Sequence, residues 1–231
     1  MFVKKFLLIS LAISVFSFSN MQGAYAKNNK NFYGKVRLGL GYEYQKYTGS
    51  DVNDVFDSVD SGKNKSNQAP VISLGYNLYY KLNKKFELLS GLEVQGRYAI
   101  KGKDFISFDN GSVEYNEFLR LSAKFGVKTN LNKKVAVETY GIIGGNMVQH
   151  KNFELLGTGR ISYKGEKITN FGLSTGVGVD FVIVDRFTIG AEYRRGFVKV
   201  DYERLNSSGY SYDSKFNMKT DSILAKIGYQ F

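Results

Sequence analysis

Apolar and polar side chains alternate along most of the chain after residue 31. In residues 32–46 the even positions, among them Leu38 and Tyr44, are largely apolar, whereas the odd positions include Arg37 and Glu43. Successive side chains of a β-strand point to opposite faces, so a period of two predicts a strand with one apolar and one polar face. The same alternation predicts further strands at 71–82, 86–100, 113–129, 135–148, 168–183, 187–199 and 219–231, with the weakest pattern in 135–148.

The segment that ends the chain has a clear version of this pattern. One face of it carries Ile223, Ala225, Ile227, Tyr229 and the terminal Phe231. An alternating strand that stops on an aromatic residue is typical of the closing strand of a bacterial outer-membrane β-barrel. Eight strands are an even number, as an antiparallel barrel needs, and eight is a common small size.

The connections between the expected strands alternate in length. Three are tight turns, at 82–85, 131–134 and 184–186, and the other four, at 47–70, 101–112, 149–167 and 200–218, are long and rich in small polar residues. Short periplasmic turns with longer extracellular loops characterise outer-membrane barrels. We therefore predict an all-β fold: an eight-stranded antiparallel transmembrane β-barrel with short periplasmic turns and four long extracellular loops.

The amino-terminal segment predicts export. Lys4 and Lys5 precede an apolar run at 6–18, which is too short to span a bilayer as a helix, and Ala24 and Ala26 provide the small residues of a signal-peptidase site. We interpret residues 1–26 as a signal peptide and residues 27–231 as the barrel. Removing the two lysines lowers the formal net charge from +11 to +9.

Composition alone leaves one alternative fold open. A chain with 15% aromatic residues, 25 glycines and one proline could also form a soluble secreted β-sandwich. The chain has no cysteine, however, and small secreted domains commonly rely on disulfides. A closed hydrogen-bonded barrel in lipid needs no such crosslink, so the cysteine count favours the barrel.

The positive charge does not indicate nucleic-acid binding. The sequence has no Gly-rich phosphate loop and no aromatic-basic platform, so we expect no nucleic-acid partner. Lysines at the outer rim are instead expected to meet the phosphates of lipopolysaccharide, with outer-membrane lipid around the barrel.

The polar face of the expected strands is rich in charge of both signs. Burying charge requires pairing, so we expect ion-pair networks that plug the barrel, in preference to an ion or proton path. The bases are Lys35, Arg37, Arg97, Arg120, Lys124, Arg194 and Lys226, and the acids are Glu43, Glu87, Glu93, Glu114, Glu138, Asp180 and Glu192.

Candidate chemistry is sparse, and we predict that the protein is not an enzyme and has no cofactor. His150 is the one histidine, no serine lies within three residues of it, and we expect it to be a solvated loop residue. Acidic residues recur at every third position in the first expected loop, as Asp51, Asp54, Asp57 and Asp60. Carboxylates suit Ca²⁺, but this spacing equally fits a short amphipathic helix or an acidic tip, so we assign no metal site.

The signal peptide, the eight strands, the Asn-Lys-Lys turns and the terminal Tyr229-Gln230-Phe231 resemble the opacity-protein and OmpA/OmpX-like family of small outer-membrane barrels. The resemblance covers the whole mature chain. It implies that the outer-membrane assembly machinery recognises the terminal strand through Ile223, Ala225, Ile227, Tyr229 and Phe231. The Lys- and Asn-rich residues 27–31 also look like those of rickettsia-like intracellular bacteria, whose small barrels are surface adhesins.

The resemblance and the loops together suggest a function at the cell surface. Our first hypothesis is an outer-membrane adhesin that binds a host protein or receptor through its extracellular loops, because binding residues concentrate on loops held by a rigid scaffold. The candidate anchors are Phe56, Phe105, Phe108, Tyr210 and Tyr212, which could equally pack within the loops. The alternatives are a structural envelope barrel without a specific ligand and a lipid-modifying barrel enzyme that depends on His150.

Overall fold

A computed structural model describes residues 31–51, 65–98, 104–108, 111–155, 161–205 and 211–231. Within these ranges the chain forms β-strands joined by tight turns. The strands are β1 (Phe32–Asp51), β2 (Lys65–Lys81), β3 (Phe86–Arg97), β4 (Asp104–Phe108), β5 (Gly111–Asn130), β6 (Val135–Leu155), β7 (Ile161–Ile183), β8 (Phe187–Leu205) and β9 (Ser211–Gln230).

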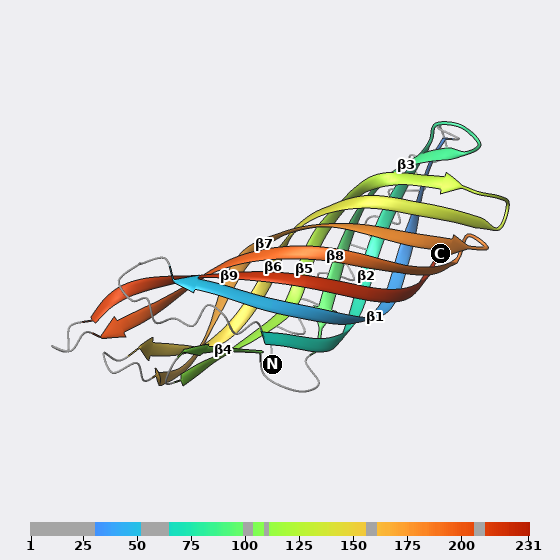
Figure 1. Cartoon of the computed structure of the whole chain (residues 1–231). Coiled ribbons are helices and arrows are strands. Elements are labelled where there is room, and N and C mark those ends of the chain that lie inside the picture. The colour runs from blue at the N-terminus through green and yellow to red at the C-terminus, as the bar shows by residue number, and fades with distance from the viewer. Residues whose placement is uncertain (1–30, 52–64, 99–103, 109–110, 156–160, 206–210) are drawn as a thin grey trace.

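The strands close into one antiparallel barrel (Figure 1). Apart from β3 and β4, which do not pair with each other, each strand pairs with its sequence neighbours, and β1 also pairs with β9 along the register from Arg37↔Gln230 to Asp51↔Phe216. Both β3 and β4 pair with β5, so they are two segments at one position in the wall, and the β3–β5 pairing closes the ring. The barrel therefore has eight antiparallel strands, as the sequence predicted.

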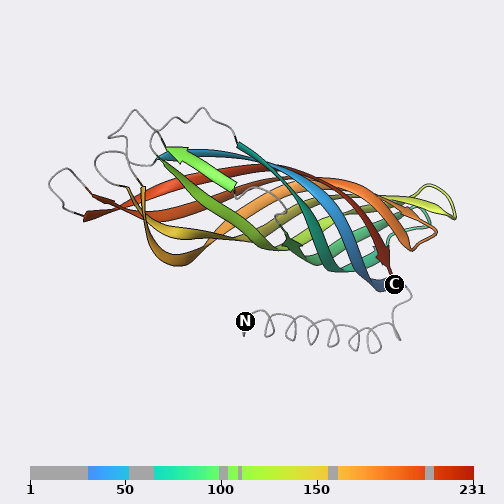
Figure 2. The ribbon, with the colours of Figure 1, turned by 90° about the horizontal axis from the view of Figure 1, so that it is seen from below.

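The barrel is elongated, and its two ends differ (Figures 1 and 2). One end, called the turn end here, carries the tight turns at 82–85, 131–134 and 184–186 together with the carboxyl terminus. The Gln230 N–H donates to the Arg186 carbonyl at 2.7 Å, and Phe231 exchanges backbone hydrogen bonds with Val36. The opposite end, the loop end, carries the last pairs of the β6–β7 and β8–β9 ladders, Leu155↔Ile161 and Leu205↔Ser211.

The two faces of the wall have inverted polarity compared with a water-soluble protein. Outward side chains are apolar and exposed, with Leu40 at 58% and Ile227 at 60%, whereas the inward carboxylates of Glu43 and Glu138 are fully buried. Apolar surface in water costs about 25 cal/mol per Å², so a continuous exposed apolar belt suits a barrel surrounded by lipid. Among the described residues, no helix combines the length and hydropathy needed to span a membrane.

Several strands extend further than the alternation predicted. The ladder of β6 and β7 continues to Leu155↔Ile161, and that of β8 and β9 continues to Leu205↔Ser211. The expected loops at 149–167 and 200–218 were therefore wrong in extent. The described apolar side chains of the second segment, such as Val200 and Met218, are buried on the inward face, so the backbone pairing continues where the outward apolar alternation has ended.

The other two long connections also contain strand. β1 reaches Asp51 and β2 begins at Lys65, inside the expected loop at 47–70. Residues 104–108, expected to be loop, form β4 and pair with the start of β5. The expected strand at 86–100 ends earlier, at Arg97.

A register shift in β5 changes the direction of one acidic side chain. The pairing of β5 with β6 is irregular between Glu117 and Leu119. An extra residue in one strand reverses which face the following residues occupy. Glu117 therefore shares the inward face with Arg120, although Leu119 and Leu121 face outward as predicted.

Two of the three tight turns are held by an asparagine. The Asn83 Oδ1 accepts the N–H groups of Lys85 and Phe86 at 2.8 and 2.9 Å, and the Asn132 Oδ1 accepts those of Lys134 and Val135 at 2.7 and 2.9 Å. These side chains satisfy backbone donors that the ladder leaves unpaired. The repeated Leu-Asn-Lys-Lys sequence thus folds into the same turn twice.

The third turn has an unusual backbone. Val184 and Asp185 have φ of 51° and 60°, and the Arg186 N–H donates to the Ile183 carbonyl at 3.1 Å. Positive φ at both central positions defines a type I′ turn, which matches the twist of a hairpin. A β-branched residue is strained there, and Val184 is 57% exposed, so no burial compensates for the strain.

We expect Val184→Asn to stabilise the barrel by about 1 kcal/mol, because asparagine tolerates positive φ and is favoured in type I′ turns. Urea unfolding of the protein in lipid vesicles measures the effect as a higher midpoint with an unchanged slope. An unchanged or lower midpoint would contradict the assignment of backbone strain to Val184.

Candidate functional site

The barrel interior is filled by charged side chains, and Glu192 of β8 lies at the centre of their network. Its carboxylate pairs with Lys124 of β5 at 2.8 Å, Lys226 of β9 at 2.6 Å and Arg194 at 2.6 Å, and it accepts the Tyr140 hydroxyl at 3.0 Å. All five side chains are nearly inaccessible to solvent. Glu192 thus links four strands across the lumen.

A second acid, Glu93 of β3, extends this network to the opposite wall. It lies 2.8 Å from Lys124 and 3.3 Å from Arg194, and it accepts the Gln95 amide at 2.8 Å. Arg194 also donates to the Ser122 hydroxyl at 2.6 Å. Two cations therefore bridge Glu93 and Glu192, which separates the two carboxylates.

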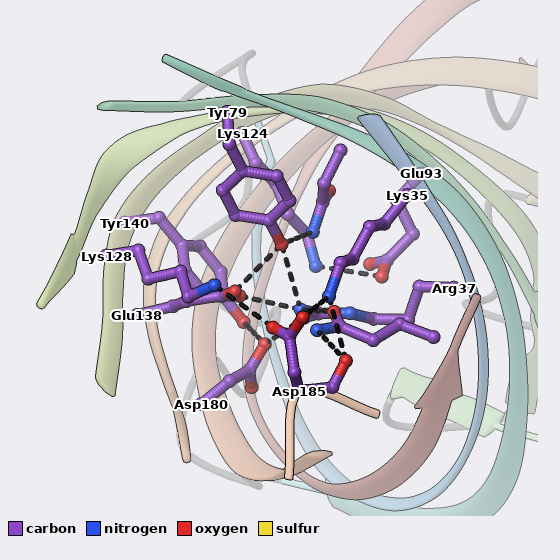
Figure 3. Close-up of polar contacts among 12 residues, drawn as sticks. Lys35, Arg37, Tyr79, Glu93, Lys124, Lys128, Glu138, Tyr140, Asp180 and Asp185 are labelled. Atoms are coloured by element: carbon purple, nitrogen blue, oxygen red, sulfur yellow. Dashed lines mark hydrogen bonds and ion pairs between the residues drawn. The ribbon is translucent and has the colours of Figure 1, made fainter. Parts of the chain in front are cut away.

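Arg37 organises the next layer toward the turn end (Figure 3). Its guanidinium donates to Asp180 at 2.6 Å, to Glu138 at 2.7 Å and to the Gln230 amide oxygen at 2.9 Å. The Tyr79 hydroxyl donates to the other Glu138 oxygen at 2.8 Å. A planar guanidinium with several donors suits such a multi-carboxylate contact better than an ammonium does.

The turn-end mouth carries a further cluster around Asp185, part of which Figure 3 shows. Asp185 pairs with Lys35 at 2.6 Å and with Lys128 at 3.3 Å. Glu87 lies 3.7 Å from Lys128 and accepts the Tyr33 hydroxyl. Partial burial raises the pKa of Asp185, but the hydrogen bond from Lys35 and the charge of Lys128 outweigh that effect, so its pKa lies below the ordinary value.

The layer toward the loop end is built around two carboxylates. Arg120 pairs with Glu43 at 2.5 Å and with Glu117 at 2.6 Å, and Arg97 pairs with Glu43 at 3.0 Å. The Gln45 amide donates to Glu117 at 2.5 Å. The inward turn of Glu117 at the β5 register shift therefore supplies Arg120 with its second carboxylate.

These layers confirm that the inward charges are paired, as the sequence analysis expected. An eight-stranded interior is just wide enough for side chains, and each layer places cations between carboxylates across the lumen. Sequence reasoning missed Lys128, Glu117 and Asp185. Lys128 follows Lys124 at the strand period and could have been found, whereas the position of Glu117 depends on the register shift and that of Asp185 on the turn. The side chain of Glu114 lies outside the described residues.

His150 is not a solvated loop residue, and that prediction was wrong. It lies in β6, is 2% exposed and has its Nε2 3.0 Å from the Asn170 amide nitrogen. The reason is that the β6–β7 ladder continues past it, with His150 opposite Ile168. Its contact with Asn170 joins it to the neighbouring strand β7.

The candidate binding aromatics fall partly outside the described residues. This is the case for Phe56 and Tyr210, and also for Asp54, Asp57 and Asp60 of the acidic run. The backbone places Phe105 and Phe108 in β4, Tyr212 in β9 and Asp51 at the end of β1. Phe105 pairs with Glu114 and Tyr212 with Arg204, so these positions belong to two different hairpins.

Four of the five residues assigned to the assembly signal share the outward face of β9, and the fifth, Phe231, follows the strand and is also exposed. Tyr229 contacts Phe187 edge-on at 5.3 Å between ring centroids and lies 6.2 Å from Phe231. Ile223 and Ile227 are exposed beside them. Recognition of this row by an assembly factor stays a prediction.

In the part of the chain that the structure describes, no cluster of three His, Asp or Glu residues could hold a metal ion.

Comparison with known proteins identifies the family. The model of the outer membrane protein β-barrel domain matches residues 8–231, which is nearly the whole chain. The chain belongs to this family. Membership agrees with the closed barrel and its apolar exterior, and it indicates the bacterial outer membrane as the location.

Solved barrels from several bacteria are similar in fold. Ail, the attachment invasion locus protein of Yersinia pestis, is 18% identical, with 86% of this chain and 99% of that chain covered and a TM-score of 0.44. OprG from Pseudomonas aeruginosa is 12% identical, with 87% and 97% covered and a TM-score of 0.40. Neisserial surface protein A is 10% identical, with 81% and 96% covered and a TM-score of 0.31. No curated protein matches the chain.

We expect Glu192→Gln to destabilise the barrel by about 3–5 kcal/mol, because it leaves buried cations without their shared carboxylate. A matched control is Asp221→Asn, which removes an outward carboxylate paired with the exposed Arg195 at 2.8 Å and should cost less than about 1 kcal/mol. Urea unfolding in lipid vesicles compares the two. Equal losses would show that the Glu192 network contributes no more than a surface ion pair.

We expect the Asp185 cluster to make stability depend on acid pH. A carboxylate with a lowered pKa in the folded state stabilises fully above its unfolded value, for which 3.8 is the reference, and the stabilisation is lost as pH falls through the folded value. Asp185→Asn should therefore lower stability at neutral pH and reduce the further loss below pH 3.8. Unfolding midpoints measured across this range test the expectation, and parallel pH profiles for the two proteins would contradict it.

Proposed function

We propose that this family member is a surface protein that binds a host protein or receptor through its loop-end hairpins. In this proposal the loop end faces the cell exterior and the turn end faces the periplasm. Residues 1–26 act as a removable signal peptide, and the outward row of β9 from Ile223 to Phe231 is the signal read by the assembly machinery.

The observation that carries the proposal is the length of the hairpins. β8 contains 19 residues and β7 contains 23, whereas a membrane-crossing strand needs about 9–11. At about 3.3 Å per residue, the residues of β8 beyond those needed to cross the membrane add some 25–30 Å of paired strand. Because β8 begins at Phe187, directly after the tight turn at 184–186, this surplus lies at the loop end. The loop-end hairpins are therefore paired as far as Leu155↔Ile161 and Leu205↔Ser211, which provides a rigid support for a binding surface.

The outward surface also has a polar edge toward the loop end. Arg195 pairs with Asp221 at 2.8 Å, and Tyr193 donates to the same carboxylate at 2.5 Å. Lys46 is the backbone partner of Asp221, and Lys219 is exposed two residues away. We propose that this edge meets the phosphates of lipopolysaccharide, since cations at an interface attract anionic head groups.

The filled interior supports binding over transport. The layers around Arg37, Glu192 and Arg120 each place paired charges across the lumen. Moving a solute past them would separate buried ion pairs, which is costly. A surface that binds a partner outside the barrel needs no such rearrangement.

The test compares adhesion of a non-adherent Gram-negative strain that displays the native barrel with one that displays a shortened barrel. The shortened form replaces 151–167 and 201–215 with two-residue Asn-Gly turns, which join positions that already pair in the ladder. We expect binding of fluorescent host cells to fall to the background of the strain without a barrel, at matched surface expression.

A second variant tests the candidate anchors. Replacement of Phe56, Phe105, Phe108, Tyr210 and Tyr212 by serine should keep the barrel folded and weaken adhesion at least about tenfold, since aromatic residues dominate interface hot spots. The control replaces five outward aromatics elsewhere with leucine. Adhesion that survives both the shortening and the serine substitutions would favour a structural envelope barrel without a specific ligand.

A further inference from the structure

The turn end of the barrel is hollowed into a basin. It has a volume of about 650 Å³ and opens at the mouth between the tight turns. Its lining includes Lys35, Lys81, Lys84, Lys128, Lys133 and Lys134, with the carboxylates of Glu87 and Asp185. A volume of this order is typical of small-molecule sites. Six lysines and two carboxylates leave an excess of four positive charges.

The two carboxylates of the basin are already paired. Asp185 pairs with Lys35 and Lys128, and Glu87 accepts the Tyr33 hydroxyl beside Lys128. This part of the lining is therefore close to electrically neutral. The unbalanced charge lies on the four rim lysines, and within the described residues no carboxylate is within ion-pair distance of their ammonium groups. The rim lysines are Lys81, Lys84, Lys133 and Lys134.

The backbone fixes where the rim lysines lie. The turns that carry Lys84 and Lys133 are closed by Asn83 and Asn132, and Asn130 joins them, since its N–H donates to the Lys85 carbonyl at 2.8 Å. The two turns are therefore neighbours, and the like charges of their lysines repel one another, so an anion between them would lower the free energy of the arrangement.

The chemistry of the rim suits a phosphate group. An ammonium is a compact point charge that serves phosphate oxygens well, whereas the fork of an arginine guanidinium suits a bidentate contact with carboxylate or phosphate. The cations lining the basin are all lysines, and Arg186 of the neighbouring turn is not among the lining residues. Several ammonium groups on different turns can each reach a separate oxygen of a tetrahedral group.

We propose that the turn-end basin binds a phosphate-bearing polyanion, either a soluble phosphate compound or the head group of an anionic phospholipid. This site is separate from the loop-end hairpins and does not depend on the adhesin proposal. The proposal assigns a ligand to the repeated Asn-Lys-Lys turns. The hairpin geometry alone does not require the two lysines of each turn.

The test measures binding of inorganic pyrophosphate by isothermal titration calorimetry. The full-length protein is held in an uncharged glycoside detergent and a phosphate-free buffer. The basin variant combines Lys84→Gln, Lys133→Gln and Lys134→Gln, and the control combines Lys85→Gln, Arg186→Gln and the exposed Lys199→Gln. The control removes the same number of positive charges, two of them at the turn end, but none of its residues lines the basin. The Lys85 ammonium lies 5.6 Å from the centroid of the Phe86 ring.

We expect the basin variant to bind pyrophosphate about tenfold more weakly and the control to change by less than about twofold, as the loss of three exposed charge contacts implies. Circular dichroism verifies that both variants are folded, and the single Lys84→Gln variant is measured if the triple variant does not fold. No binding by the native protein, or equal losses in the two triple variants, would overturn the site.

Two further arms define the ligand. Citrate, matched to pyrophosphate in charge, is expected to bind more weakly, and equal binding would overturn the phosphate assignment. Adding phosphatidylglycerol to the micelles separates the two sources. A loss of pyrophosphate binding through competition supports the lipid head group, whereas unchanged binding supports a soluble phosphate compound.

Discussion

The structure depends on closure of the backbone hydrogen-bond ladder. In lipid an unpaired peptide group costs several kcal/mol, so a strand can cross only if both of its edges are paired. The pairing of β3 with β5 and of β1 with β9 removes the edges that an open sheet would have. Once the ring is closed, side chains must alternate between lipid and lumen, and the other features follow from that alternation.

The closed ring forces charges into a narrow space, and pairing is what makes their burial tolerable. Glu192 illustrates this, because its carboxylate is shared by Lys124, Lys226 and Arg194. The same network fills the lumen, so the barrel acts as a rigid scaffold that holds the structures at its loop end and its turn end. At the loop end the ladders extend as paired hairpins, and at the turn end the lysines of two turns surround a basin.

The tight turns and the loop-end hairpins differ in how far the local sequence specifies their structure. Asn83 and Asn132 close their turns with their own side chains, so each turn is specified by its own four residues. Val184 and Asp185 adopt positive φ without a glycine or asparagine, because the twist of β7 and β8 requires it. In the loop-end hairpins the described apolar side chains, such as Val200 and Met218, are buried on the inward face, which is why the outward apolar alternation stopped short of the true strand ends.

The sequence by itself determined the number of strands, the face that each residue occupies along most of them and the positions of the tight turns. These properties depend on a side-chain period of two and on turn chemistry, both of which are local. Tertiary structure decided which charges meet, as when Arg37 contacts Glu138, 101 residues away, and Gln230, 193 residues away. It also turned Glu117 inward, buried His150 and gathered the lysines of separate turns around one basin. Such relations depend on strand register and ring closure, which bring distant segments together and leave no periodic signal in the chain.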